Sequence, residues 1–362
     1  MSTQKISINS TPHTKLEDLF CDFCSTKKIT FKYKINNDFI FKCEGCGIMF
    51  SSFDREKSQE LYNKAYYSSD NNNEGYSNYN AMSITHKSSF EKRLEFIERN
   101  YQKGGVVFDF GCALGHFCEV AKNRNWNVIG SDINTYAAQF VKKKYNINTF
   151  ICDISHPPLK NDIADLICLY DLIEHTTYPR KALEAIKQIL KNDGILHIVT
   201  PDSNCISAKI LGRYWFHYKP KEHLFYFNKN NLKNLMEEIG FEILKIDSNV
   251  SYMTLQDIFL RLGSYLGPVS KYMIKILSMF NLNNYIIPIY VGNFEIVATP
   301  NKTIHYEKNN NQLKNLINAN DIYICPNCNN NIDISAEKII CDNCSIVYGN
   351  DYGVPNFIGD IN

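Results

Sequence analysis

Positions 106–117 of the sequence read Val106-Val-Phe-Asp-Phe-Gly-Cys-Ala-Leu-Gly-His-Phe117, an apolar run that leads through Asp109 into a glycine-containing turn. A strand that ends in such a turn lets a ligand approach the backbone at the carboxyl edge of a parallel sheet, because glycine has no side chain in the way. The spacing Gly111-x-x-x-Gly115 differs from the Gly-x-Gly-x-x-Gly of dinucleotide-binding folds, which argues against NAD. The alternative is an α/β domain with a tight turn and surface acids.

Two acidic residues follow at the ends of the next apolar runs. Val128-Ile-Gly-Ser-Asp132 places Asp132 about 20 residues after Asp109, the distance at which a carboxylate meets a ribose diol in nucleotide-binding sheets. Phe150-Ile-Cys-Asp153 places a third acid at the end of the following run. Because the carboxyl ends of parallel strands meet at one edge of a sheet, the acids and the glycine turn together predict a nucleotide-like ligand there.

Residues 104–300 alternate short apolar runs with segments of helical periodicity, which is typical of an α/β domain with a largely parallel sheet. Seven strands are predicted, at Val106–Phe110, Asn127–Ser131, Asn148–Cys152, Asp165–Tyr170, Ile195–Val199, Phe241–Ile246 and Phe294–Ala298. Helices are predicted at Ser83–Asn100, Phe117–Arg124, Thr135–Tyr145, Pro179–Leu190 and Lys229–Ile239.

An apolar insertion at residues 252–290 precedes the last predicted strand. Leu255, Ile258, Phe259 and Leu262 recur at helical spacing, which predicts helical structure. Core packing or a lid over the substrate is the leading interpretation. A surface for a lipid-linked substrate or a homodimer partner is the alternative.

Cysteine is unusually frequent, with 13 residues in the chain. Most of them form Cys-x-x-Cys pairs, at Cys21/Cys24, Cys43/Cys46, Cys325/Cys328 and Cys341/Cys344. Residues 25–42 separate the first two pairs, and residues 329–340 separate the last two. Each framework supplies thiolates from two tight turns, which suits tetrahedral zinc in a closed, structural site. Reduced hairpins, disulfides and iron are the alternatives.

The patterns divide the chain into consecutive parts. These are a zinc ribbon at 15–52, a tyrosine-rich and helical lead-in at 53–103, the α/β domain at 104–300, a linker at 301–320 and a second zinc ribbon at 321–358. Because Asn301–Asn315 is polar and rich in asparagine, we expect residues 316–362 to be removable without loss of the catalytic fold.

The charge balance gives little indication of a charged partner. A net charge of +1 and 44% hydrophobic residues indicate a sizeable core and no global attraction to nucleic acid or anionic membranes. Residues 209–221 form a modest cluster of basic and aromatic side chains, so the nucleic-acid signal is not strong. The segment Met1–Thr14 is polar, and no stretch approaches the ~18 apolar residues of a membrane span. A soluble, cytoplasmic protein is therefore expected.

Residues 104–200 resemble a class I S-adenosylmethionine-dependent methyltransferase. Asp109, Gly111 and Gly115 match its first motif, and Asp165–His175, which ends in Glu-His, resembles its strand-four motif. Ala113 departs from the family, which often has a second glycine there. The resemblance implies an α/β fold with a seven-stranded, doubly wound, Rossmann-like sheet of order 3-2-1-4-5-7-6 whose last strand is antiparallel.

The resemblance also implies which residues bind S-adenosylmethionine. Asp132 is expected to bind the ribose and Asp153 to lie on the adenine side. The full set of expected cofactor-binding residues is Asp109, Gly111, Cys112, Ala113, Gly115, Asp132, Ile133, Asp153, Ile154, Tyr170 and Asp171.

Two segments resemble bacterial sugar methyltransferases that carry an N-terminal zinc-binding domain. They are Lys221-Glu-His-Leu-Phe-Tyr-Phe227 and the tyrosine segment from Gly75 to Tyr79. The resemblance implies a nucleotide-linked or cell-surface sugar as the acceptor. Tyr76, Tyr79 and Trp215 are the expected substrate-binding residues.

The second ribbon leaves the substrate open. With Tyr348 and Gly353-Val-Pro-Asn-Phe-Ile358, it resembles the zinc-ribbon activator subunit of tRNA and protein methyltransferases, here fused to the enzyme. A tRNA or protein methyltransferase is therefore an alternative. A non-catalytic binding module on a relict methyltransferase fold is the third interpretation.

Histidines are the candidates for acid–base chemistry. Methyl transfer from a sulfonium is an in-line displacement, so the enzyme must position the acceptor and exclude water. A hydroxyl or carbon acid also needs a base, for which histidine is suited. We predict His223 as this base, oriented by Glu222, with His175 as the competing candidate. For His175 the alternative is packing at the strand–helix turn, and His217 beside Trp215 is expected to be structural.

Overall fold

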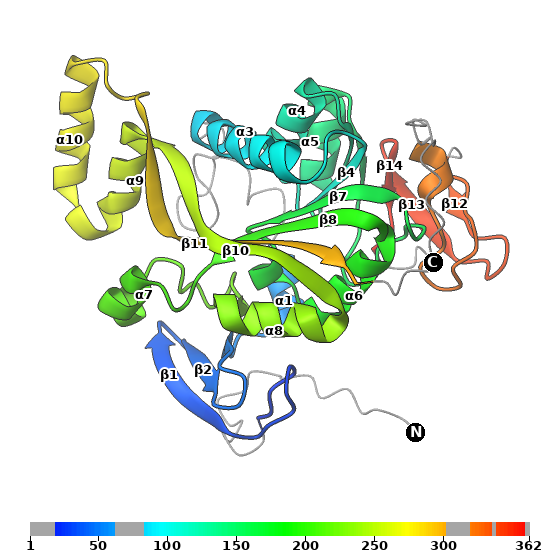
Figure 1. Ribbon diagram of the computed structural model, residues 1–362, viewed down its shortest axis with the longest axis horizontal. Helices are drawn as coiled ribbons and strands as arrows, with labels where there is room; N and C mark the ends of the chain where they lie inside the picture. The colour runs from blue at the N-terminus through cyan, green and yellow to red at the C-terminus, as the bar shows by residue number, and fades with distance from the viewer. Residues whose placement is uncertain (1–18, 62–82, 302–318, 335–337, 359–362) are drawn as a thin grey trace.

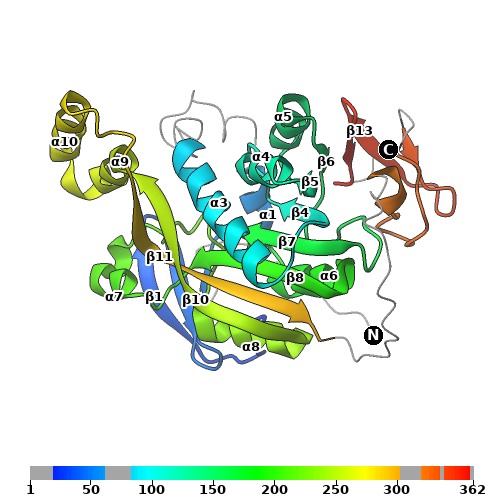
Figure 2. The same ribbon diagram turned by 45° about the horizontal axis from the view of Figure 1, so that its top comes forward.

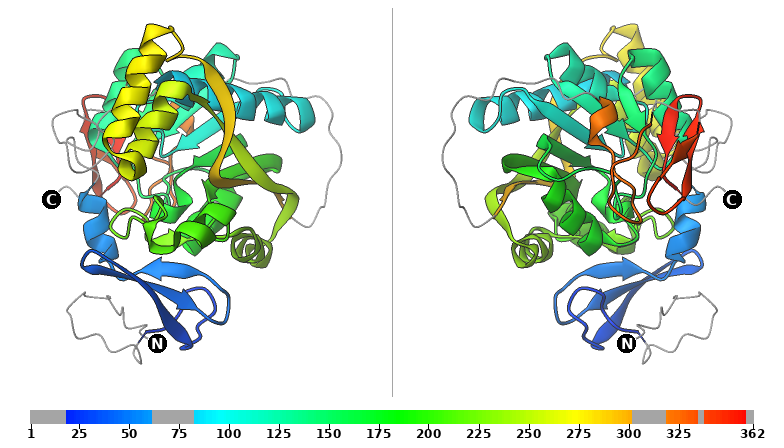
Figure 3. Two further views of the ribbon diagram at one scale, coloured as in Figure 1. Left: turned by 90° about the vertical axis from the view of Figure 1, so that its left-hand side faces the viewer. Right: turned by 90° about the vertical axis from the view of Figure 1, so that its right-hand side faces the viewer.

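The computed structural model describes residues 19–61, 83–301, 319–334 and 338–358 of the 362-residue chain. Figure 1 shows a central α/β body with a small β unit from the N-terminal part of the chain and another from the C-terminal part. Figure 3 places these two units against different sides of the body.

The body is built on one seven-stranded sheet of order β10-β11-β8-β7-β4-β5-β6. Its strands are β4 (Val106–Phe110), β5 (Asn127–Ser131), β6 (Asn148–Phe150), β7 (Ala164–Tyr170), β8 (Leu190–Pro201), β10 (Phe241–Thr254) and β11 (Ile286–Pro300). β8, β7, β4, β5 and β6 are mutually parallel, whereas β11 is antiparallel to both β8 and β10. Numbered along the chain, this is the expected order 3-2-1-4-5-7-6 with the last strand antiparallel, so the predicted fold class is confirmed.

Helices cover both faces of the sheet (Figure 2). One face carries α3 (Ser83–Asn100), α4 (His116–Asn123) and α5 (Thr135–Tyr145), and the other carries α6 (Pro179–Ile189) and α8 (Lys229–Ile239). Residues with specific backbone or capping preferences determine where these helices begin and end. Proline lies in the first turn of α6, and Asn228 caps α8 in a reciprocal capping box with Asn231. Gly240 then ends α8 in the left-handed conformation, at φ 95°.

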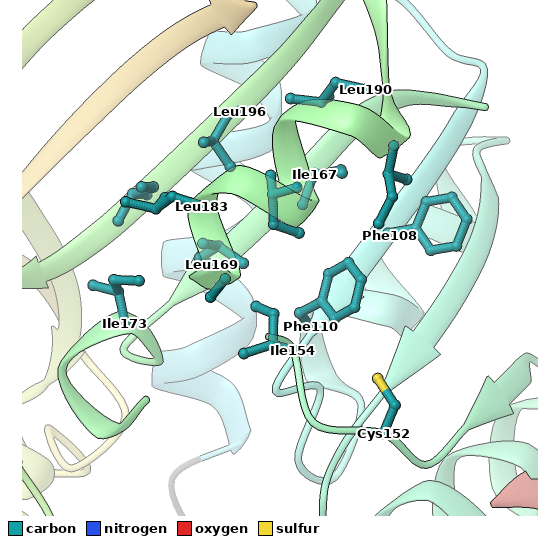
Figure 4. Packing of buried hydrophobic residues seen from close by; sticks show 14 of the residues in the cluster. Phe108, Phe110, Cys152, Ile154, Ile167, Leu169, Ile173, Leu183, Leu190 and Leu196 are labelled. Carbon is teal, nitrogen blue, oxygen red and sulfur yellow. The ribbon is translucent and has the colours of Figure 1, made fainter. Parts of the chain in front are cut away.

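Alternate residues of the central strands face opposite sides of the sheet and divide the interior into two apolar layers. Phe108 and Phe110 of β4 pack with Ile167 and Leu169 of β7 in the layer beneath α6 and α8 (Figure 4). Val107, which directly precedes Phe108, belongs to the opposite layer with residues of α3 and α4. Every residue of β4 is buried, as expected for the centre of a parallel sheet.

The N-terminal unit is a four-stranded sheet of order β1-β2-β3-β9. The ribbon supplies β1 (Ile29–Ile35), β2 (Asp38–Cys43) and β3 (Met49–Ser51), and the body supplies β9 (Phe225–Tyr226). Phe50 pairs with Phe225, and the N–H of Ser51 donates to the carbonyl of Leu224 at 2.9 Å. The ribbon is therefore joined by backbone pairing to the segment that carries the predicted Glu222-His223 motif.

The C-terminal unit contains β12 (Ile339–Ile340), β13 (Val347–Asp351) and β14 (Val354–Asn356). β14 lies beside the edge strand β6, where Ile151 donates to the carbonyl of Pro355 and accepts from the N–H of Phe357, both at 2.8 Å. Tyr323 is buried, with its ring 5.6 Å from that of Phe150. The ribbon thus covers an edge of the sheet and contributes a ring to its core, and whether residues 316–362 can be removed stays a prediction.

The insertion between the last two strands is a helical hairpin on a two-stranded β ribbon (Figures 1 and 3). α9 (Leu255–Leu266) and α10 (Pro268–Met279) join the extended ends of β10 and β11. These strands run well beyond the predicted 241–246 and 294–298, because they continue to pair with each other along the extension. Among the described residues, no helix is long and apolar enough to cross a bilayer.

Candidate cofactor and acceptor site

The glycine turn follows β4 and is held against the end of β5. The N–H of Gly111 donates to the carbonyl of Ser131 at 2.7 Å. Gly111 has φ 73°, and a Cβ there would lie 2.9 Å from Leu172 Cδ1. Gly115 has φ 76°, and a Cβ there would lie 2.7 Å from Val141 Cγ2. Both positions therefore require glycine for conformation as well as for space.

The carboxylate of Asp132 is bonded to this turn. Its Oδ2 accepts from the N–H of Ala113 and its Oδ1 from the N–H of Asn134, both at 2.8 Å. Asp132 is buried, and burial raises its pKa to about 6. A carboxylate has about four acceptor positions, so two N–H groups leave capacity for a ribose diol. The structure thus brings together the glycine turn and the acid that the sequence assigned to the ribose.

Asp109 and Cys112 support the turn from inside the domain. Asp109 Oδ2 accepts a hydrogen bond from Cys118 Sγ at 3.1 Å, and burial raises the pKa of Asp109 to about 7. The sulfur of Cys112 faces Gly130, where an added Cβ would lie 3.2 Å from it. Since both side chains point inward, a contact of these predicted cofactor residues with a ligand would use their backbone.

Further predicted cofactor-binding residues, among them the adenine-side Asp153, lie at the ends of β5 and β6. Asp153 is half-buried, and its Oδ1 accepts from both the N–H and the hydroxyl of Ser155 at 2.8 Å. Ile133 is half-buried next to Asp132, whereas Ile154 is buried in the core. Asp153 and Ile133 are therefore the members of this group that border the edge of the sheet.

Tyr170 and Asp171, also predicted to bind the cofactor, lie at the end of β7. The Tyr170 ring is buried against Phe90, and its hydroxyl is hydrogen-bonded to His197 Nδ1 at 2.9 Å. Its hydroxyl is therefore engaged in the interior. Asp171 is exposed, with φ 51°, and its Oδ1 accepts from Asn293 Nδ2 at 3.2 Å. Asp171 is thus the more accessible of the two.

A buried polar network behind Tyr170 was not predicted. Arg93 Nη2 donates to Asn249 Oδ1 at 2.8 Å, and Asn249 Nδ2 donates to Glu295 Oε2 at 2.9 Å. Glu295 also lies 3.4 Å from His197 Nε2 and accepts from Lys245 at 2.5 Å. The sequence signal was the placement of charged residues within otherwise apolar strands. The network connects α3 with β8, β10 and β11, and so fixes the helix that covers Tyr170.

Two predicted catalytic histidines meet at the carboxyl edge of the sheet. His175 ends the short helix η2 (Ile173–His175) after β7, and His223 lies in the loop before β9. Their ring centroids are 4.6 Å apart at 87°. The N–H of Leu224 donates to the carbonyl of Glu174 at 2.9 Å, which ties the two segments together. The sequence separation of the two motifs gave no indication of this distance.

Glu222 contacts His175 through its backbone. Its carbonyl accepts from His175 Nδ1 at 2.9 Å, and its carboxylate accepts from Lys219 Nζ at 3.3 Å. Sequence reasoning had assigned Glu222 to the orientation of His223. In the structure the hydrogen bond from His175 Nδ1 to the Glu222 carbonyl orients the His175 ring instead, and the proposed general-base role of His223 stays a prediction.

Glu174 completes the cluster and was missed as a site residue. One potential ligand atom from each of Glu174, His175 and His223 lies within 4.8 Å of the others. Glu174 is buried, and its Oε2 accepts from Thr200 Oγ1 at 2.9 Å. The signal that could have found it is its position directly before His175 in a motif already recognised.

Burial controls the charge of this cluster. It raises the pKa of Glu174 well above its usual range, lowers that of His175 to about 4 and lowers that of His223 well below 6.5. Both imidazoles are therefore neutral at pH 7. A base is most effective when its pKa lies near the working pH, so His223 is better suited to donating a lone pair than to holding a proton.

The expected substrate residues are only partly described. Trp215 is buried, its ring lies 4.8 Å from that of His217, and it packs with Ile40 and Met49 of the N-terminal ribbon. Trp215 thus lies between the ribbon and the histidine loop. Tyr76 and Tyr79 lie outside the described residues.

The paired cysteines gather into two clusters, each with its four sulfurs within 4.8 Å of one another. The shortest separations are 3.4 Å between Cys24 and Cys43 and 3.4 Å between Cys328 and Cys341. These distances exceed the ~2.05 Å of a disulfide and approach the roughly 3.8 Å between thiolates of tetrahedral zinc. The N–H of Gly45 points at the Cys43 sulfur at 3.3 Å, as in zinc knuckles. Both clusters therefore fit zinc.

Comparison with known proteins relates the body to a described family. Residues 82–246 match the model of a family described as a methyltransferase domain. The uncharacterized protein MJ0638 of Methanocaldococcus jannaschii is 32% identical over 121 residues, which cover 33% of this chain and 51% of that protein. The protein MJ1123 of the same organism is 25% identical over 169 residues, covering 44% of this chain and 76% of that protein. The chain thus spans about half the length of MJ0638.

Solved structures with a similar arrangement are more distant. A SAM-dependent methyltransferase from Archaeoglobus fulgidus is 19% identical, with a TM-score of 0.42 over 59% of this chain and 94% of that one. The YcgJ protein of Bacillus subtilis is 15% identical, with a TM-score of 0.44 over 60% of this chain and all of that one, 100%.

Proposed function

We propose that the chain catalyses S-adenosylmethionine-dependent methyl transfer to a small hydroxylated or keto acceptor, with a nucleotide-linked or cell-surface sugar as the leading class. The observation that supports this most strongly is the bond between the Ala113 N–H and Asp132 Oδ2, at 2.8 Å. It joins the glycine turn to a buried acid with acceptor capacity left, at the sheet edge that also carries the two histidines.

The ribose and the adenine of the cofactor each have an acidic residue suited to them. When bound, S-adenosylmethionine supplies an electrophilic methyl group on a sulfonium. Asp132 accepts the ribose hydroxyls, and Asp153 borders the adenine side. Gly111 and Gly115 give the turn its shape, since a Cβ at either position would collide with Leu172 or Val141. Methyl transfer needs the acceptor to be held in line with the sulfonium and shielded from water.

The acceptor side is formed by the histidine pair and its loop. His175 and His223 present neutral rings to an acceptor hydroxyl, and Glu222 holds the His175 ring through its carbonyl. The N-terminal ribbon supports this loop through β3 and through Ser51 Oγ, which donates to the Pro220 carbonyl at 2.6 Å. We propose that zinc in this ribbon acts structurally, because a four-cysteine set has no open coordination position.

Cofactor binding is the direct test. Calorimetry with S-adenosylhomocysteine should show binding to the intact protein and at least tenfold weaker binding to Asp132→Ala, because each charge-assisted bond contributes roughly 1.5–3 kcal/mol. Asp247→Ala, which removes an exposed carboxylate on β10, should bind normally. Equal affinity in all three proteins would exclude Asp132 as the ribose acid. Absence of binding to the folded wild-type protein would favour the non-catalytic binding module.

A macromolecular acceptor is the second candidate. It is favoured by the C-terminal ribbon, which resembles the activator subunit of tRNA and protein methyltransferases and pairs with Ile151 at the sheet edge. Incubation with labelled S-adenosylmethionine and either small sugars or total tRNA and protein separates the two. Label in the sugar fraction supports the first proposal, and label in tRNA or protein supports the second.

A further inference from the structure

The cluster of Glu174, His175 and His223 has the composition of an open metal site. Two imidazoles and one carboxylate form the ligand set of catalytic zinc sites and of non-haem iron(II) sites, which keep coordination positions open for other ligands. The potential ligand atoms lie within 4.8 Å of one another. With bonds of about 2.0–2.2 Å from the metal to nitrogen and oxygen, small side-chain adjustments would bring them around one ion.

Each imidazole already has the hydrogen bond that fixes a metal-binding tautomer. His175 donates its Nδ1–H to the carbonyl of Glu222 at 2.9 Å, so its Nε2 carries the lone pair. The His223 ring bonds to the backbone of His217, and its Nδ1 has no hydrogen-bond partner among the described residues. Metal-binding histidines characteristically donate the other ring N–H to a carbonyl or carboxylate in this way. Both rings are therefore oriented as ligands.

The two carboxyl oxygens of Glu174 also differ, since one is hydrogen-bonded and the other is not. Glu174 Oε2 is held by the Thr200 hydroxyl at 2.9 Å, whereas Oε1 is buried without a hydrogen-bond partner in the described part of the chain. A buried carboxyl oxygen without a hydrogen-bond partner is costly, and a metal ion bound at the cluster would satisfy it.

We propose that Glu174, His175 and His223 bind one divalent transition-metal ion, with open positions directed at the acceptor of methyl transfer. The proposal that the cluster binds a metal depends only on the geometry of these three side chains. The role of the ion in methyl transfer rests on the proposed function. In that role the ion would hold an acceptor oxygen and lower the pKa of an acceptor hydroxyl. His223 is then a ligand, and its lone pair is not available to act as the base.

The eight paired cysteines require a probe that distinguishes the ribbons from this cluster. Protein whose ribbons hold zinc, and from which less tightly bound metal has been removed with a mild chelator, is titrated with Co²⁺ and followed by optical spectroscopy and elemental analysis. The expected result is one additional Co²⁺ per chain with weak d–d absorption and no thiolate charge-transfer band. Binding of no additional ion, or an additional ion that carries thiolate bands, would overturn the proposal.

Ligand variants locate the ion. Glu174→Gln keeps the size of the side chain and its bond to Thr200, and it should weaken Co²⁺ binding by more than about 100-fold, since even outer-shell changes cost 10–100-fold. His223→Ala should do the same. His156→Ala removes an exposed histidine outside the cluster and should bind Co²⁺ as the wild type does. Loss of the ion in His156→Ala, or its retention in folded Glu174→Gln and His223→Ala, would contradict the assignment.

The metal-site proposal and the proposed methyltransferase function can be disproved independently of each other. If S-adenosylhomocysteine binds but no additional Co²⁺ does, the metal site is excluded and His223 returns to its predicted role as base. If Co²⁺ binds as described but S-adenosylhomocysteine does not, the site exists and the proposed function is wrong. An unfolding temperature for each variant, compared with wild type, confirms that these readings come from folded protein.

Discussion

Ala113 occupies a left-handed backbone conformation, at φ 47°, within the glycine turn. A residue with a Cβ pays roughly 1–2 kcal/mol for this conformation relative to glycine. Ala113→Gly should therefore raise the free energy of unfolding by about 1 kcal/mol, because relief of this strain exceeds the added freedom of the unfolded chain. Denaturant unfolding measures the change.

Ala121 in helix α4 is the matched control, because it is buried in an ordinary helical conformation. Ala121→Gly should lower the free energy of unfolding by about 1 kcal/mol or more. If Ala113→Gly destabilises the protein as Ala121→Gly does, the strain at position 113 is not real.

Asp132 makes the stability of the unliganded protein depend on pH. Burial raises its pKa from the usual 3.8 to about 6 in the folded state. Between about pH 4 and pH 6, Asp132 is therefore protonated in the folded protein and already ionised in the unfolded chain. This contribution to stability is complete below about pH 4 and is lost as the pH rises through about 6. Asp132→Asn should flatten that part of the profile, measured as unfolding temperature against pH.

Cofactor affinity should change with pH in the opposite direction. The ionised Asp132 accepts the ribose hydroxyls more strongly than the protonated acid does. Affinity for S-adenosylhomocysteine should therefore increase from about pH 5 to about pH 7, as Asp132 loses its proton, and Asp132→Asn should remove this increase. An affinity of the wild type that does not vary over this range would show that the acid is not at the ribose.

Among the elements, β3 and β9 make the histidine loop dependent on the N-terminal ribbon. Phe50 pairs with Phe225 across these strands. If Cys43 is a zinc ligand, Cys43→Ser should loosen the ribbon and raise amide hydrogen exchange in residues 220–227. Cys341→Ser in the second ribbon should instead raise exchange at Ile151. Identical exchange patterns in the two variants would show that the ribbons do not act locally.

Local signals explain which elements could be predicted from the sequence. β4 and β7 are continuous apolar runs, and α5 and α8 have clear periodicity and caps, so their bounds were found to within one or two residues. β9 and β14 have only two and three residues, and both depend on partners distant in sequence. Such short strands carry no periodicity of their own, which is why the docking of both ribbons was not predicted.

The site likewise contains residues whose contacts could be predicted from the sequence and residues whose contacts could not. The glycine turn and Asp132 lie on consecutive strands of a regular fold, so their spacing predicted their contact. Glu174, His175 and His223 meet only because two loops cross at the sheet edge, and no spacing in the sequence records that crossing. The Arg93 network is similar, since its members come from one helix and separate strands.

At the scale of the whole molecule, the C-terminal ribbon contributes to the core of the α/β body. Tyr323 is 2% exposed and stacks with Phe357 at 5.7 Å. Tyr323→Ala should lower the stability of the entire protein by about 3–5 kcal/mol, as expected for loss of a buried aromatic ring. Calorimetric unfolding should show a single transition at a lower temperature.

Tyr352 provides the control from the same ribbon, because it is 94% exposed. Tyr352→Ala should change stability by less than about 0.5 kcal/mol. If Tyr323→Ala instead leaves the main transition unchanged and melts only a small separate unit, the ribbon is an independent domain after all.

The pairing of β14 with Ile151 also imposes an order on biosynthesis. About 200 residues separate the two segments. At roughly 5–20 residues per second, a ribosome needs tens of seconds to translate these intervening residues. Throughout that interval the outer edge of β6 presents unpaired N–H and C=O groups, the arrangement that recruits strands from neighbouring chains. A nascent chain is therefore most vulnerable to aggregation after the strands of its central sheet have emerged and before its last ribbon has been translated.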